Sequence, residues 1–120
     1  AEVTRIPFDA EGYYRAADVA EAIQPNTRLV ALTHGSNVLG TIQPVSEIGR
    51  LCRDRRIPFL VDAAQTAGSI PIDVKEMSID LLAAPGHKSL FGPVGTGFLY
   101  VSPNVELHCW REGGTGGDSG

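Results

Sequence analysis

Three short apolar runs, separated by helix-like stretches, limit this chain to few folds. The runs Leu29–Leu32, Ile57–Val61 and Ile79–Ala83 are too short for core helices and are bounded by polar or helix-breaking residues, as expected of buried strands. Residues 16–23 and 44–56 instead carry apolar side chains at helical spacing. Short apolar strands that alternate with helices predict an α/β fold with a mostly parallel sheet and helices on both faces.

Other features extend this pattern toward both ends. Val3–Phe8 alternates loosely and predicts a strand, and Gly97–Val101 is a further apolar run that we expect to be a buried strand. Pro25 is expected to stop the first helix, and Pro44 to lie in the first turn of the second, with Cys52 on its buried face. We therefore expect about five strands and two long helices of a larger sheet.

The two ends predict that this chain is a piece of a longer protein. It begins without Met and ends in a Gly-rich run with no closing element. We expect residues 1–112 to belong to a larger domain and residues 113–120 to lead into a C-terminal part that is absent. An incomplete sheet exposes strand edges, so the isolated chain is expected to aggregate.

Composition excludes several classes of function. The chain has 120 residues, a net charge of -4 and no basic stripe with interleaved aromatic residues, which argues against a nucleic-acid partner. No run is long enough to span a membrane and no leader precedes Ala1, so we expect a cytoplasmic protein without a membrane partner. Cys52 and Cys109 are too few for a disulfide framework and lack metal-binding spacing.

The polar residues that invite a functional explanation follow the predicted strands. Ligands bind parallel α/β sheets at the carboxyl ends of the strands, which gathers the loops 34–37, 62–65 and 85–89. In the last loop, Lys88 lies between two apolar runs on a stretch too rich in Gly and Pro for a helix. A lone loop lysine is most often a solvated surface residue, but partial burial favours its neutral, nucleophilic amine.

Several chemistries compete for these residues. Asp62 at a strand end is suited to cap a helix, to bind a metal or to pair with the charge of a cofactor, and capping is the commonest role of such an Asp. His34, His87 and Asp80 make a metal site conceivable, but their spacing matches no metal motif, and we expect no metal. No strained nucleophile elbow and no phosphate-binding glycine motif precedes a helix, which argues against a serine hydrolase and a nucleotide site.

Three motifs occur in order along the chain, namely His34–Gly40, Val61–Gln65, and Pro85–Pro93 followed by Gly95–Gly97. Together they resemble the core of class V aminotransferases, and of the cysteine desulfurase group in particular, and the resemblance runs from about Val3 to the C-terminus. It implies the large domain of a fold-type I pyridoxal-phosphate enzyme, with residues 1–112 as an incomplete part of the cofactor-binding domain.

The resemblance also implies a role for each matching residue. Lys88 would hold the aldehyde of pyridoxal phosphate as a Schiff base, and Asp62 would keep the ring nitrogen protonated. Gln65 matches the residue that hydrogen-bonds the phenolic oxygen of the ring, and Asn37 one near that oxygen and the substrate carboxylate. His87 matches a phosphate contact.

Two further positions bear on the resemblance. Thr115 matches a residue that reaches the phosphate of the partner subunit's cofactor, which implies a homodimer with shared active sites. Pro85 departs from the family, because many members have a phosphate-binding Ser there. Either other groups hold the phosphate, or the chain belongs to a divergent subgroup of the family.

The function implied is that of a cysteine desulfurase or selenocysteine lyase acting on a small amino acid. A class V transaminase or another pyridoxal-phosphate lyase is the alternative within the family, and a non-catalytic truncated domain is the alternative from another class. Neither Cys52 nor Cys109 matches the catalytic cysteine of desulfurases, which is expected beyond Gly120 with the carboxylate-binding arginine. The isolated chain is therefore expected to be inactive.

Overall fold

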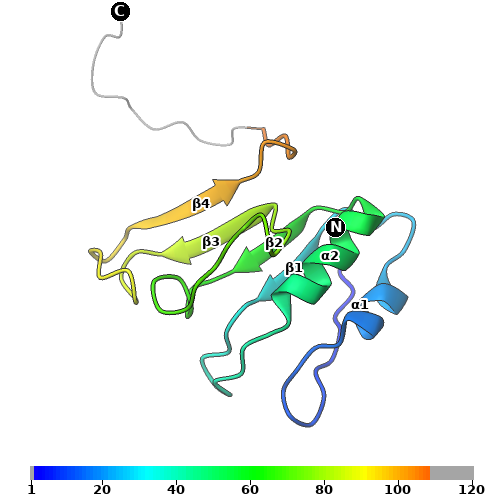
Figure 1. The fold of residues 1–120 in the computed structure, drawn as a ribbon, viewed down its shortest axis with the longest axis horizontal. Coiled ribbons are helices and arrows are strands. Elements are labelled where there is room, and N and C mark those ends of the chain that lie inside the picture. Colours follow the sequence, from blue (N-terminus) through cyan, green and yellow to red (C-terminus); the bar gives the residue numbers. More distant parts are fainter. Residues whose placement is uncertain (1, 109–120) are drawn as a thin grey trace, which may run out of the picture.

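The computed structural model describes residues 2–108 as one mixed α/β unit (Figure 1). Its elements follow each other as helix, strand, helix and then three strands. They are α1 (Ala16–Ala22), β1 (Val30–Thr33), α2 (Val45–Arg55), β2 (Phe59–Asp62), β3 (Leu81–Pro85) and β4 (Gly97–Val101). No helix in this part of the chain is long and apolar enough to cross a bilayer.

The four strands form a single sheet in the order β1-β2-β3-β4. The strands β1, β2 and β3 are parallel, whereas β4 runs antiparallel to β3. The predicted α/β class with a mostly parallel sheet is therefore confirmed. The parallel strands end at one edge of the sheet, and Figure 1 shows their arrowheads pointing the same way.

The core lies between α2 and the centre of the sheet. Ile48 and Cys52 of α2 and Phe59 and Val61 of β2 are completely buried in one cluster. Their spacing explains the contact, because residues four apart share a helix face and residues two apart share a strand face. Burial, together with the negative charge of Asp80, raises the pKa of the Cys52 thiol to about 11, so this cysteine is a structural residue, as predicted.

Both described helices lie on the same side of the sheet, α2 against β2 and α1 against α2. The sequence predicts helices on both faces. In the structure, β1, β2 and β3 follow one another across the sheet in a single direction. Right-handed crossovers then place the connections between them on one face of the sheet. The in-register row Leu32, Val61, Leu82 and Tyr100 faces the helices. The next row, Thr33, Asp62, Ala83 and Leu99, faces away from them.

Two sequence-based predictions about single elements are wrong, and a third places a residue one position too far into its helix. Val3–Phe8 forms no strand; instead, Asp9 Oδ1 accepts a hydrogen bond from the Tyr13 N–H at 2.8 Å and shapes the following turn. The strand β4 is not buried, since Phe98 is 45% exposed at the sheet edge. Pro44 precedes α2 as its N-cap rather than lying in the first turn.

Candidate functional site

Three loops lie together at the carboxyl edge of the parallel strands, as the strand order predicts (Figure 1). The loop after β1 touches the turn after β2, because a Cβ added to Gly35 would lie 2.7 Å from Thr66 Cγ2. That turn touches the loop after β3, because a Cβ added to Gly68 would lie 2.6 Å from the Ser89 carbonyl oxygen. These approaches need glycine, since a real Cβ does not come that close to another atom.

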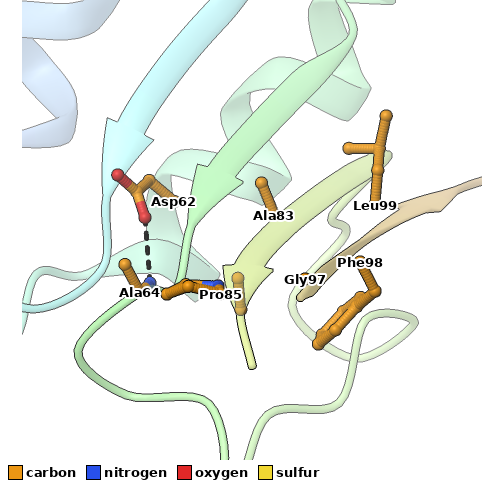
Figure 2. A pocket seen from close by; sticks show the side chains of 8 residues that line it. Asp62, Ala64, Ala83, Pro85, Gly97, Phe98 and Leu99 are labelled. Carbon is orange, nitrogen blue, oxygen red and sulfur yellow. Dashed lines mark hydrogen bonds between the residues drawn. The ribbon is translucent and has the colours of Figure 1, made fainter. Parts of the chain in front are cut away.

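A pocket of about 540 Å³ opens at the same edge, on the sheet face that points away from α2. Figure 2 shows its lining, in which one carboxylate stands among apolar side chains. The lining residues are Asp62, Ala64, Ala83, Ala84, Pro85, Gly97, Phe98 and Leu99. A largely apolar pocket with a single charged group at strand ends is a common form of ligand site.

Asp62 provides the charge of this pocket. It is the last residue of β2, and its side chain is exposed on the face opposite the core. One carboxylate oxygen, Oδ1, accepts a hydrogen bond from the Ala64 N–H at 2.9 Å (Figure 2). No helix follows Asp62, so it shapes a turn rather than capping a helix, and its carboxylate stays at the pocket.

Among the predicted site residues that the structure describes, Asp62 alone lines the pocket, whereas the others lie in the neighbouring loops. Lys88 is half-buried in the loop after β3, and its carbonyl accepts the Phe91 N–H at 2.9 Å. His87 and Asn37 are exposed, and Gln65 is half-buried.

Thr115 lies outside the described residues, as does Cys109. The role predicted for Thr115 therefore stays a prediction.

His34 makes a buried hydrogen bond between two loops. Its ring Nδ1 lies 2.9 Å from Thr66 Oγ1, and burial lowers the pKa of its imidazole. Within residues 2–108, no group of three or more His, Cys, Asp or Glu side chains is arranged to hold a metal ion.

Sequence reasoning missed the residues that shape the pocket walls. Ala83 and Leu99 are neighbours across β3 and β4, and both lie in register with Asp62. The two-residue period of each strand could have placed them on one face, but the antiparallel pairing of β4 carries no signal in a single sequence. The pairing of His34 with Thr66 was also missed, because a contact between two loops far apart in the chain carries no signal in a single sequence.

The chemistry of the pocket fits a pyridinium ring. An exposed carboxylate at Asp62 suits a protonated ring nitrogen, and the small side chains of Ala64 and Ala83 leave room for a flat ring beside it. Pro85, which also lines the pocket, offers neither a hydroxyl nor an N–H to a phosphate. A phosphate on such a ring would therefore need donors from outside this lining.

Comparison with known proteins supports the same cofactor. Cysteine desulfurase IscS of Clostridium botulinum is 42% identical over 113 residues, which cover 94% of this chain and 28% of that protein. The putative cysteine desulfurase IscS 1 of Bacillus subtilis is 45% identical over 113 residues, which cover 94% of this chain and 30% of that protein. A solved structure of SspA in complex with cysteine matches with a TM-score of 0.83 at 44% identity, covering 91% of this chain and 31% of that one.

The chain thus spans less than a third of the length of these relatives. Class V aminotransferases and cysteine desulfurases are pyridoxal-phosphate enzymes, which agrees with the cofactor that the motifs predict. The family model of class-V aminotransferases matches residues 1–118, nearly the whole sequence. Its match, the shared fold and the carboxylate-bearing pocket lead to one conclusion: the chain belongs to the class-V aminotransferase family.

Proposed function

We propose that the whole protein is a pyridoxal-phosphate-dependent cysteine desulfurase. The observation that carries this proposal is the position of the Asp62 carboxylate in an otherwise apolar pocket, beside the loop that bears Lys88. The relatives named as cysteine desulfurases, and a neighbour solved with cysteine, favour cysteine as the substrate.

Asp62 would supply fixed negative charge at the ring nitrogen. When bound, pyridoxal phosphate withdraws electrons from the bonds at the α-carbon of an amino acid, and it does so best with a protonated ring. The carboxylate lies at the end of a strand in which Phe59 and Val61 are completely buried, so its position is set by the core. A preorganised charge of this kind stabilises the transition state without reorganisation cost.

Lys88 would bind the cofactor covalently in the resting enzyme. The Lys88 amine, when not bonded to the cofactor, would move a proton at the substrate α-carbon. Its loop is held by hydrogen bonds from the Phe91 N–H to the Lys88 carbonyl at 2.9 Å and from the Gly92 N–H to the Gly86 carbonyl at 2.8 Å. These bonds restrict where the amine can reach.

The remaining polar groups would orient the ring and the phosphate. Gln65 and Asn37 would donate hydrogen bonds toward the phenolic oxygen, with Asn37 also near the substrate carboxylate. His87, which is exposed beside Lys88, would contact the phosphate. Because Pro85 provides no donor, His87 would have a larger share in binding the phosphate than in relatives with Ser at that position.

The assembly and location also belong to this proposal. Thr115 would reach the phosphate of the partner subunit's cofactor, which makes the active enzyme a homodimer with shared sites. We place this dimer in the cytoplasm. Sedimentation of the whole protein and fractionation of cells that produce it would test the two statements.

Covalent labelling at Lys88 tests the proposal directly. The whole protein should be yellow with bound pyridoxal phosphate, and borohydride should attach the cofactor irreversibly to the peptide that contains Lys88. With dithiothreitol present as the reductant, the protein should also release sulfide from cysteine. Lys88→Ala should abolish the labelling and the sulfide release. Release of a keto acid by amino transfer without sulfide would instead identify a transaminase.

The chain contains a matched control for this experiment. Lys75 is the other lysine of the sequence, and it is exposed. Lys75→Ala should leave colour, labelling and sulfide release unchanged. Label on Lys75 in place of Lys88 would refute the assignment.

A further inference from the structure

A buried hydrogen bond joins two of the loops at the carboxyl edge of the sheet. His34 Nδ1 lies 2.9 Å from Thr66 Oγ1, and the two residues are 3% and 1% exposed. Buried polar groups of this kind rely on protein partners rather than on bulk water, so the pair is held in one geometry.

The backbone around the pair is also held at short range. The His34 N–H donates to the Asp62 carbonyl at 2.8 Å, and the His34 carbonyl accepts the Gln43 N–H at 2.8 Å. A Cβ on Gly35 would come within 2.7 Å of Thr66 Cγ2, so glycine is required for this contact. His34 is thus fixed through both main-chain groups and through its ring.

Each member of the pair is close in sequence to a predicted cofactor contact. Gln65 directly precedes Thr66, in a turn closed by a hydrogen bond from the Thr66 N–H to the Ala63 carbonyl at 3.0 Å. Asn37 lies three residues after His34 in the other loop. The relative positions of Asn37 and Gln65 therefore depend on how the two loops are joined.

We propose that His34 and Thr66 form a positioning pair that fixes the separation of the Asn37 and Gln65 amides. This inference rests on the proposed function, in which both amides face the same oxygen of the cofactor. The pair itself acts through the loops and does not touch the cofactor. Burial lowers the pKa of the His34 imidazole, so the ring is neutral at pH 7 and no charge is buried with the hydrogen bond.

Two single variants separate the hydrogen bond from the packing. Thr66→Val preserves the shape of the side chain and its contact with Gly35, but removes the hydroxyl. Thr66→Ser keeps the hydroxyl and loses the methyl group. The double variant His34→Leu/Thr66→Val removes both polar partners, so no buried donor or acceptor is left without a partner and folding is retained.

The first measurement is titration of the whole apoprotein with pyridoxal phosphate, followed by absorbance. Thr66→Val should weaken binding by about fivefold to tenfold, as expected when one hydrogen bond toward the cofactor is misplaced. Thr66→Ser should stay within about twofold of the wild type. The double variant should recover the melting temperature of the apoprotein but should still bind the cofactor weakly.

Wild-type affinity in the double variant would overturn the inference, because packing alone would then set the loops. Equal weakening by Thr66→Ser and Thr66→Val would overturn it as well.

Hydrogen exchange of the apoprotein separates this inference from the proposed function. In Thr66→Val, the backbone amides of residues 36–40 and 64–68 should exchange faster together, while those of α2 should not change. If the wild type binds no pyridoxal phosphate, the proposed function fails, and this measurement still decides whether the pair joins the loops. Faster exchange confined to residues 64–68 would overturn the joining role.

Discussion

The strands β2 and β4 are both apolar and lie in one sheet, yet they differ in burial. In β2, Phe59 and Val61 are completely buried, whereas in β4 Phe98 is 45% and Leu99 is 53% exposed. The strand β2 has a strand on each side and α2 above it, while β4 pairs with β3 alone in the part of the chain that the structure describes. Burial therefore follows from the number of neighbours rather than from the apolar content of the run.

The difference in burial also separates the residues that stabilise the fold from those that are exposed to a ligand. The buried side chains of β2 hold the strand in place, and the exposed carboxylate of Asp62 at its end lines the pocket. Beside β4, the loop 86–96 exposes Phe91 and Val94 almost fully, at 94% and 88%. We expect substitutions in the core of β2 to lower the free energy of unfolding strongly. Substitutions around β4 should lower it much less.

The largest effect is expected from Phe59→Ala. Removal of a completely buried aromatic ring leaves a cavity, which should lower the free energy of unfolding of the whole protein by about 3–5 kcal/mol. Phe98→Ala is the matched control and should cost roughly 1 kcal/mol, because nearly half of that residue is already exposed. Urea denaturation measures both values. Equal losses would mean that β4 is covered as completely as β2 in the whole protein.

Asp62→Asn should change turnover without changing stability. Loss of the charge at the ring nitrogen should slow sulfide release by on the order of a hundredfold. The free energy of unfolding should change by less than about 0.5 kcal/mol, because the side chain is exposed and Asn can still accept the Ala64 N–H. Asp54→Asn, an exposed position on α2, is the control for turnover. An unchanged rate would mean that Asp62 only shapes the turn after β2.

A smaller, pH-dependent effect is expected from His34, beside the end of β2. Its pKa is lowered by burial from the ordinary value of 6.5, so the unfolded chain binds the proton more tightly than the folded protein. Stability should therefore be unaffected by this group above pH 6.5 and should fall as the pH drops below it. Denaturation of the wild type at pH 7.5 and 5.5 should show this loss.

The double variant His34→Leu/Thr66→Val should show a smaller difference between the two pH values. His87→Gln, an exposed position, should behave as the wild type does. The same acid sensitivity in the double variant would assign it to other groups.

The smallest effect, with the opposite sign, is expected in the loop before β4. Phe91 has a φ of 55°, which disfavours a side chain, and it is exposed. Phe91→Gly should therefore raise the free energy of unfolding, by less than about 1 kcal/mol. Gly95→Ala, at a φ of 87°, should lower it. A clear loss of stability in Phe91→Gly would show that this side chain is packed in the whole protein.

Much of the fold could be predicted because it depends on local patterns. Pro25 ends the first helix soon after Ala22, and the apolar spacing from Val45 to Cys52 places α2 on the core. The failure at Val3–Phe8 has a physical reason, since alternation makes a strand only where a neighbouring strand offers hydrogen bonds, and here none pairs with it in the described sheet.

The candidate site was predicted in part. The three loops could be found because parallel strands end at one edge, which brings the segments containing Asp62 and Lys88 together. The walls of the pocket could not be found, because Leu99 reaches Ala83 only through the antiparallel register of β4. The tight approach of Gly35 to Thr66 is likewise invisible in a single sequence.

Apart from Val3–Phe8, the sequence by itself determined which segments become strands or helices and which polar residues stand at their ends, because hydrophobic periodicity and helix-breaking residues act over a few neighbours. The tertiary structure alone decided that β4 is an exposed edge, that both described helices share one side of the sheet, and that His34 meets Thr66. Those outcomes depend on register and on contacts between residues far apart in the chain, and no local pattern encodes them.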